Sequence, residues 1–245
     1  MNHKMPLTTT VLITLSLLLA ASVSPADVPT ACKVDNIHRI KQITNYCGPA
    51  CLAMVLRHYG KDITQEAIGK EVYDAVTGAT NGADMLLYAR QQGFAAYSWN
   101  SSVADLKDKI AQGIPVIVLQ ENSRRDSSGH FRVVIGYDED TANFSVLDPY
   151  YDEITDIKYS ECDRLWKGLG YWGLLIVPVG KDKFKQELED RNPVVHMDLA
   201  FAKYKHKIYD SALKEARTAL RLEPGNTFAL SMVTKIQRAL AAGPK

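Results

Sequence analysis

The chain has 245 residues, of which 46% are hydrophobic, and its 29 lysines and arginines nearly balance 28 aspartates and glutamates. This is the composition of an ordinary globular protein with enough apolar side chains for a core, so a disordered or fibrous chain is excluded. The formal net charge of +1 gives no support to nucleic acid as a partner.

Residues 1–26 are predicted to be a signal peptide. Lys4 precedes an apolar run at residues 11–21, and small residues close the segment at 24–26. This order matches the charged, hydrophobic and cleavage regions of a secretory signal. The run is shorter than the about 20 apolar residues that cross a bilayer. We therefore expect an exported protein, periplasmic or secreted, that begins near Asp27 and has no membrane span in its mature form.

The charge is uneven along the mature chain. Residues 27–180 carry 15 basic and 20 acidic side chains, whereas residues 181–245 carry 13 basic and 8 acidic ones. Such asymmetry predicts two units, a body of residues 27–180 and a tail of residues 181–245. Their opposite signs favour docking of the tail on the body, although exposed charge pairs contribute little.

In the body, helical patterns come first and extended segments second. Amphipathic spacing, cap residues and glycine stops predict helices at residues 48–59, 64–76, 81–92 and 102–112, with one strand at 94–99. Next come a buried strand at 115–120, a hairpin over 130–150 with its turn at 138–143, a helix at 160–167 and a strand at 171–179. This order predicts an α+β fold with an antiparallel sheet rather than a doubly wound parallel sheet.

The tail is predicted to be helical, with breaks near residues 192–193, 209–210 and 223–226. It resembles one tetratricopeptide unit, a helix–turn–helix of about 34 residues. The matching positions are Leu199, Ala200, Ala212, Ala219 and Pro224. Lys203 and Ala216 depart from that pattern, and an ordinary helical hairpin is the alternative. A single unit cannot bury both of its faces, so we expect this small all-α extension to pack on the body or on a protein partner.

The segment QITNYCGPACLAMVLRHYG holds two cysteines one helical turn apart. Cys47 stands where the helix begins, and a helix N-terminus lowers the pKa of a thiol. Cys51 lies one turn deeper among apolar residues. We therefore predict Cys47 as a nucleophile and Cys51 as a core residue. Gln42, which alone would more often be a surface residue, can supply an oxyanion donor beside the Cys47 N–H.

Four cysteines in an exported chain suggest a disulfide. If Cys47 must stay a thiol, one bridge, for example between Cys32 and Cys162, leaves Cys51 in the core. The sequence leaves the pairing open. Lipid attachment at Cys32 is disfavoured because Pro29 stands where an apolar residue is expected.

His130 is the predicted base because it opens an apolar strand after a polar loop at residues 122–129. The other histidines lie in the signal, the lead-in, the far end of the first helix, or the tail (His3, His38, His58, His196 and His206). Asp148 ends the partner strand of the predicted hairpin, which brings it towards His130. Its carboxylate can then orient the imidazole. The alternatives are a strand-edge histidine and an aspartate that caps the turn before Pro149.

Together these segments resemble the papain-like cysteine peptidases that process double-glycine leaders of bacteriocins. The resemblance rests on Gln42 and Cys47 in the segment above, His130 in GHFRVVIGYDE and Asp148 in VLDPYYDE, and it covers residues 40–179. It implies a papain-like fold, a Cys/His/Asp triad with Gln42 at the oxyanion, a thioester intermediate, and no metal or cofactor. The best-known members are fused to transporters and act inside the cell, so their leader substrate does not carry over.

Three functions follow from these residues. The first is an extracytoplasmic cysteine peptidase that acts on a peptide or protein. The second is a transacylase or transglutaminase-like enzyme, in which an amine replaces water. The third is a non-catalytic peptide-binding adaptor whose tail docks a partner. The four catalytic residue types favour an enzyme, because a binder has no need of the thiol, and we predict the peptidase.

Overall fold

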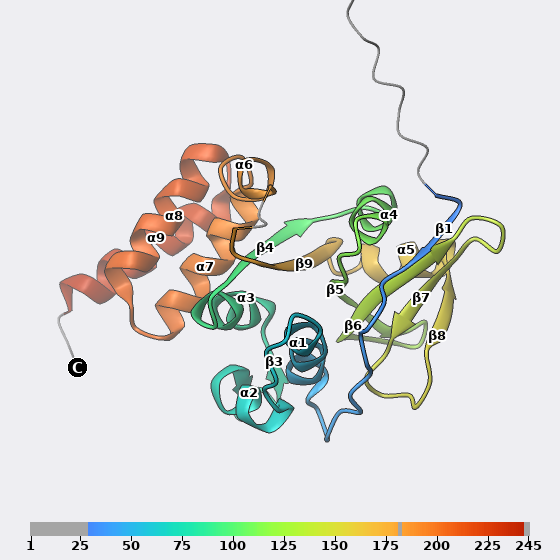
Figure 1. Ribbon diagram of the computed structural model, residues 1–245. Coiled ribbons are helices and arrows are strands. Elements are labelled where there is room, and N and C mark those ends of the chain that lie inside the picture. Colours follow the sequence, from blue (N-terminus) through green and yellow to red (C-terminus); the bar gives the residue numbers. More distant parts are fainter. Residues whose placement is uncertain (1–28, 181–182, 243–245) are drawn as a thin grey trace, which may run out of the picture.

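The computed structural model describes residues 29–180 and 183–242 (Figure 1). The predicted signal peptide at residues 1–26 lies outside them. In Figure 1, helices α1–α3 lie on one side of a central sheet and α4 on the other; the tail helices α6 and α7 lie beside strand β4, and α8 and α9 lie beyond α7. No helix in the described part of the chain is long and apolar enough to cross a membrane.

The helices of the body begin where the sequence offers cap residues. They are α1 (Cys47–His58), α2 (Gln65–Val72), α3 (Gly82–Gln91), α4 (Val103–Ala111) and α5 (Tyr159–Lys167). Thr64, Asn81 and Ser102 each accept a backbone N–H from the first turn of the following helix, which satisfies a donor that a helix start leaves free. The helices predicted at 48–59, 81–92, 102–112 and 160–167 are confirmed within a residue or so.

The helix predicted at residues 64–76 is too long. It ends at Val72, and the chain continues into a hairpin of β2 (Tyr73–Asp74) and β3 (Ala79–Thr80). Gly78 has a φ of +69° in the turn, a conformation that glycine adopts without steric cost. This hairpin forms part of the wall of the cleft described below.

The main sheet is antiparallel with the strand order β4-β9-β5-β6-β7-β8, and β1 also pairs with β6. Its strands are β1 (Ala31–Lys33), β4 (Phe94–Asn100), β5 (Val116–Ser123), β6 (Asp126–Asp138), β7 (Asn143–Leu147), β8 (Thr155–Lys158) and β9 (Trp172–Pro178). The predicted strands and the 138–143 turn are confirmed. The polar stretch 122–129, expected as a loop, instead forms the paired ends of β5 and β6, where Ser123 faces Asp126.

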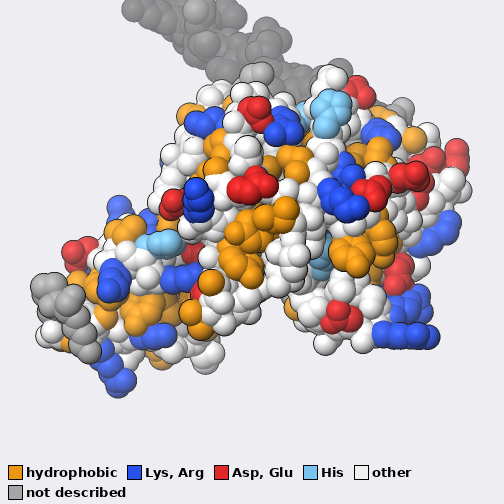
Figure 2. Space-filling model, turned by 90° about the horizontal axis from the view of Figure 1, so that it is seen from below, with side chains coloured by type: hydrophobic (Ala, Val, Ile, Leu, Met, Phe, Trp, Pro, Cys, Tyr) orange, Lys and Arg blue, Asp and Glu red, His pale blue; other side chains and the backbone are white. Residues whose placement is uncertain are grey.

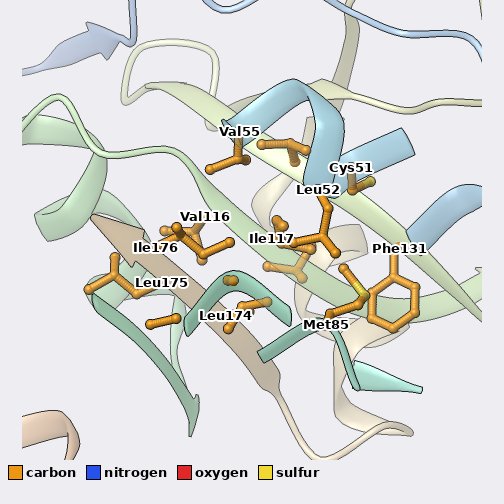
Figure 3. Close-up of a cluster of buried hydrophobic side chains, with 14 of the residues drawn as sticks. Cys51, Leu52, Val55, Met85, Val116, Ile117, Phe131, Leu174, Leu175 and Ile176 are labelled. Atoms are coloured by element: carbon orange, nitrogen blue, oxygen red, sulfur yellow. The ribbon is translucent and has the colours of Figure 1, made fainter. Parts of the chain in front are cut away.

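A buried apolar cluster fixes α1 on the sheet (Figure 3). Leu52 and Val55 of α1 and Met85 of α3 pack with buried side chains of three strands: Val116, Ile117, Phe131, Leu174, Leu175 and Ile176. Each fully buried side chain of this size contributes about 1.5–3 kcal/mol. The cluster therefore holds the start of α1 at a defined place above the sheet.

The tail contains α6 (Lys185–Leu188), α7 (Pro193–Lys205), α8 (Tyr209–Leu222) and α9 (Thr227–Ala241). The expected helical extension and its breaks are confirmed, while the tetratricopeptide resemblance stays a prediction. Val195 and Leu199 of α7 join the core of the body. The tail has its own small core of Met197, Ala200, Ala212, Ala216, Ala219, Ala229, Met232 and Ile236.

All four cysteines are free thiols. The bridge considered between Cys32 and Cys162 is absent, because the two side chains have other neighbours. The Cys32 thiol lies 3.5 Å from the carbonyl oxygen of Ile110. The Cys162 sulfur lies 3.1 Å from the side-chain amide of Gln120.

Candidate active site

Cys47 is the first residue of α1, at the end where the helix dipole is positive. Asn45 leads into it with a φ of +63°, which asparagine tolerates better than most residues. Gly48 lets the helix start approach β3 closely, because a Cβ there would lie 2.7 Å from Thr80 Cγ2. The local sequence thus places the thiol beside the hairpin β2–β3.

The thiol of Cys47 interacts with His130. Burial opposes ionisation of Cys47, but the hydrogen bond and charge of His130, with backbone hydrogen bonds from Phe131 and Gly48, together outweigh that cost and lower the pKa of Cys47. For His130, burial favours the neutral ring, but hydrogen bonds to Asp148 and Cys47 raise its pKa. The two shifts have opposite signs and a shared cause, since thiolate and imidazolium stabilise each other. The pair is therefore poised to share one proton.

Asp148 holds the other side of the imidazole. His130 Nε2 lies 2.8 Å from Asp148 Oδ1, which leaves Nδ1 as the ring nitrogen available to Cys47. The same carboxylate oxygen accepts the backbone N–H of Tyr150 at 2.9 Å. Burial raises the pKa of Asp148, but the bond to His130 and the charges of His130 and Arg132 lower it overall. The hairpin register, with Val133 opposite Leu147, brings these groups together as the sequence predicts.

Arg132 is a site residue that the sequence reasoning missed. It lies two residues after His130 and therefore on the same face of β6. Its Nε donates to Asp148 Oδ2 at 2.8 Å, and its other nitrogens donate to the carbonyls of Glu121 and Asn122 at 3.2 and 2.9 Å. The sequence did contain a signal for Arg132, namely a lone arginine inside an apolar strand. A charge buried there is almost always paired, so a partner was to be expected.

Gln42 lies beside the cysteine on the segment that leads to α1. Its backbone N–H donates to the carbonyl of Pro149 at 2.9 Å, which ties it to the loop after Asp148. Its side-chain oxygen is buried without a hydrogen-bond partner in the described residues. The side-chain amide of Gln65 bonds to the backbone on both sides of Gln42. Its oxygen accepts the Ile43 N–H at 3.0 Å, and its nitrogen donates to the Lys41 carbonyl at 2.8 Å. Gln65 is a second residue that the sequence reasoning missed.

A cleft of about 790 Å³ contains the four predicted site residues, Gln42, Cys47, His130 and Asp148. One wall is the hairpin β2–β3, and the ends of β5 and β6 form another. Tyr150 and Tyr151 lie at its rim with 66% and 54% of their surfaces exposed. An extended peptide has room in a cleft of this size.

Cys51 and Cys162 sit in environments that favour the neutral thiol. Cys51 is fully buried, and burial raises its pKa well above the ordinary value. Burial also raises the pKa of Cys162 to about 12. Within residues 29–180 and 183–242, no group of three or more His, Cys, Asp or Glu side chains is arranged to hold a metal ion.

The model of the Peptidase_C39 like family matches residues 34–175, more than half of the chain. The chain belongs to this family. It is a cysteine peptidase, as the sequence predicted, and the four residues predicted for its site lie within the matched segment. The match ends before α6, so the tail lies outside it. A comparison with curated protein sequences gives no significant match.

The comparison with solved structures also finds peptidases. A putative C39-like peptidase from Bacillus anthracis has a TM-score of 0.51 and 16% identity, with 62% of this chain and 99% of that one covered. The peptidase domain of Streptococcus ComA, a bi-functional ABC transporter, has a TM-score of 0.48, 23% identity, and coverages of 57% and 97%. A double glycine motif protease from an AMS/PCAT transporter, in complex with its leader peptide, has a TM-score of 0.47, 23% identity, and coverages of 60% and 95%. The papain-like α+β fold of the C39-like peptidase is confirmed by its helices and antiparallel sheet together with the likeness to the first of these structures.

Proposed function

We propose that this C39-like peptidase is an extracytoplasmic enzyme that hydrolyses a peptide or protein with Cys47 as nucleophile, His130 as general base and acid, and Asp148 as the group that orients His130. The observation that carries the proposal is the continuous arrangement of thiol, imidazole and carboxylate in one cleft. Cys47 interacts with His130, and His130 lies 2.8 Å from Asp148. Extracytoplasmic location rests on the predicted signal at residues 1–26.

The first half of the reaction transfers the acyl group to sulfur. The Cys47 proton moves to His130, and the thiolate attacks the carbonyl carbon of the scissile bond. The resulting oxyanion accepts hydrogen bonds from the backbone N–H of Cys47 and the side-chain amide of Gln42. Loss of one such donor typically costs about 100- to 1000-fold in rate. His130 then gives its proton to the leaving amine, the C–N bond breaks, and a thioester remains on Cys47.

The second half returns the enzyme to its starting state. His130 takes a proton from water, and the hydroxide attacks the thioester carbonyl, with the same donors at the oxyanion. The C–S bond breaks, the acid is released, and the proton on His130 returns to the Cys47 sulfur. Asp148 stays ionised throughout and stabilises the imidazolium. No metal or cofactor takes part in these steps.

The experiment that tests the proposal compares Cys47→Ala with Cys51→Ala. The full chain is incubated with a peptide library, and cleavage is followed by mass spectrometry; labelling by iodoacetamide is mapped in parallel. We expect Cys47→Ala to lose turnover by at least about 1000-fold, as other catalytic nucleophiles do, and to lose the fast labelling. Cys51→Ala, one helical turn away, should keep both. Turnover that survives in Cys47→Ala, or labelling that maps to Cys51, would overturn the assignment.

The location is tested separately. Mass spectrometry of the mature protein from the envelope and medium of its own cells should find an N-terminus near Asp27. Detection of the intact residues 1–26 on a cytoplasmic protein would contradict the export proposal and leave the catalytic one standing.

A further inference from the structure

A groove of about 1130 Å³ lies in the tail, between the end of α7, the start of α8 and one face of α9. Its lining combines aromatic, aliphatic and basic side chains and includes no acidic residue. Tyr204 and Tyr209 form an aromatic pair at one side, with ring centroids 5.6 Å apart. Leu230 and Leu240 are 56% and 37% exposed, so they add exposed apolar area to the groove. In Figure 2, hydrophobic side chains gather on the tail with basic ones around them.

Three cations of the groove, Lys207, Lys235 and Arg238, have no carboxylate within 4.0 Å among the described residues. The amine of Lys235 lies 4.9 Å from the centroid of the Tyr204 ring, which orients it within the groove. In contrast, two lysines on the same α7 are paired: Lys203 with Glu215 at 2.7 Å and Lys205 with Asp84 at 2.8 Å. The groove is therefore a concave surface with free positive charge and exposed apolar area side by side.

The groove lies at the end of the tail that contacts the wall of the active-site cleft. α7 ends at Lys205, whose amine is 3.5 Å from Asp74 in β2. β2 pairs with β3, and Thr80 of β3 lines the cleft that holds Cys47. A peptide chain that leaves the cleft over this hairpin therefore meets the end of α7 and the groove next to it.

We propose that this tail groove binds an acidic segment of the peptide substrate, one that also carries leucine or aromatic side chains, at a distance from the bond that is cut. The proposal rests on the proposed function of Cys47 and adds a substrate class to it. Carboxylates of the segment pair with Lys207, Lys235 and Arg238, and its apolar side chains cover Tyr204, Tyr209 and the exposed leucines. A concave surface suits such a segment better than a flat anionic membrane, which touches protruding side chains first.

The first experiment measures binding to the full chain carrying Cys47→Ala, by fluorescence anisotropy. The probe is a dye-labelled synthetic peptide with alternating glutamate and leucine pairs, and a matched peptide has lysine in place of every glutamate. The triple variant Lys207→Glu/Lys235→Glu/Arg238→Glu reverses the charge of the groove. We expect it to weaken binding of the acidic peptide by at least about 10-fold, and we expect rising salt to weaken binding to the unaltered groove.

The matched control reverses three cations on α8 instead: Lys214→Glu/Arg217→Glu/Arg221→Glu. These side chains border a separate surface of the tail, so the net charge changes equally while the groove stays intact. This control should bind the acidic peptide like the parent chain, and both triples should unfold at similar temperatures. Equal loss in the two triples, or equal binding of the lysine peptide, would overturn the proposal. Binding of anionic phosphatidylglycerol vesicles, but not of the acidic peptide, in a groove-dependent way would identify a membrane surface instead.

The second experiment asks whether the groove serves Cys47. The acidic peptide is joined through flexible linkers of graded length to a thiol-reactive vinyl sulfone, and labelling of Cys47 is timed against the vinyl sulfone alone. Binding in the groove raises the effective concentration of the electrophile, so we expect labelling about 10-fold faster or more at the best linker length. The groove triple should lose this gain and keep the basal rate. No gain at any length would refute the link to substrate, whereas absence of basal labelling would refute the role of Cys47.

Discussion

At Cys47 and His130, two neighbouring groups have pKa values shifted in opposite directions. The pKa of Cys47 is lowered and that of His130 is raised, and both shifts favour the thiolate–imidazolium form over the neutral pair. The apparent pKa values belong to the pair rather than to either residue. Asp148 favours the same form because its hydrogen bond and charge raise the His130 pKa.

Asp148→Asn is therefore expected to lower the apparent pKa of His130 and to raise that of Cys47. The sign follows because the neutral amide no longer stabilises the imidazolium, and the weaker imidazolium stabilises the thiolate less. An NMR titration of the His130 ring, together with the pH dependence of Cys47 alkylation, measures both values. Unchanged titrations would show that Asp148 affects only geometry.

Arg132 binds the same carboxylate, but its effect on the pKa of His130 is opposite to that of Asp148. Its charge lowers the pKa of His130, and its side chain is only 9% exposed. Arg132→Met is expected to raise the His130 pKa, whereas Arg132→Lys should keep the charge and leave that pKa closer to its original value. Because the guanidinium also holds Asp148 at 2.8 Å, turnover in both variants should fall, by up to about 100-fold if the imidazole moves by an ångström.

The same NMR titration separates the two roles of Arg132. A His130 pKa that falls in Arg132→Met would mean that the residue works by holding Asp148 against the ring, and that its charge has little effect. Removing one partner of a buried ion pair typically costs about 3–5 kcal/mol of folding free energy, so thermal unfolding of each variant is measured first.

The segment before α1 is held against helix α2, because the side chain of Gln65 at the start of α2 hydrogen-bonds to backbone groups on both sides of Gln42. Gln65→Leu, which is similar in size, removes these bonds and frees the segment. We expect turnover to fall by about 10- to 100-fold, because an oxyanion donor that is not held in place stabilises the transition state less.

Alkylation of Cys47 by iodoacetamide tests this assignment, because that reaction forms no oxyanion. In Gln65→Leu and in Gln42→Ala its rate should stay near that of the parent chain while peptide turnover falls. If alkylation slows as much as turnover, Gln65 supports the whole site rather than the oxyanion donor, and its role as a positioning residue for Gln42 is wrong.

Local signals predicted the elements well, and long-range contacts explain what was missed. Thr64, Asn81 and Ser102 cap the helices that their side chains predict, because capping depends on only the next few residues. Strand β8 was not predicted because its sequence is mostly polar, and its position follows from its pairing with β7. Arg132 and Gln65 were missed for the same reason. Their roles depend on partners 16 and at least 22 positions away, which a single sequence does not reveal.

Across the whole molecule, charged pairs of both polarities join the body and the tail. Lys205 of the tail lies 2.8 Å from the buried Asp84 of the body, and Arg90 of the body lies 3.4 Å from Glu189 of the tail. A partly exposed pair such as Arg90–Glu189 contributes little. The apolar contacts of Val195 and Leu199 with the core of the body are the larger contribution to docking of the tail.

The interface also contains Asp198 of α7, which accepts the indole N–H of Trp172 at 2.8 Å. Burial raises the pKa of Asp198. A carboxyl with a raised pKa binds its proton more tightly in the folded chain than in the unfolded one, so its contribution to stability falls as the pH rises through the folded pKa. At neutral pH, where the unfolded chain is ionised, this residue destabilises the junction of tail and body.

Asp198→Asn should therefore stabilise the protein at neutral pH, since an amide oxygen can still accept the Trp172 N–H without any charge to bury. We expect a gain of about 1 kcal/mol, or roughly 2–4 °C in Tm for a chain of this size, and we expect the gain to vanish near the ordinary aspartate pKa of about 3.9. Asp190→Asn, at an exposed position of the tail, is the matched control and should change Tm little at either pH. A lower Tm for Asp198→Asn at neutral pH would mean that the bond from Trp172 to a charged carboxylate outweighs the cost of burying it.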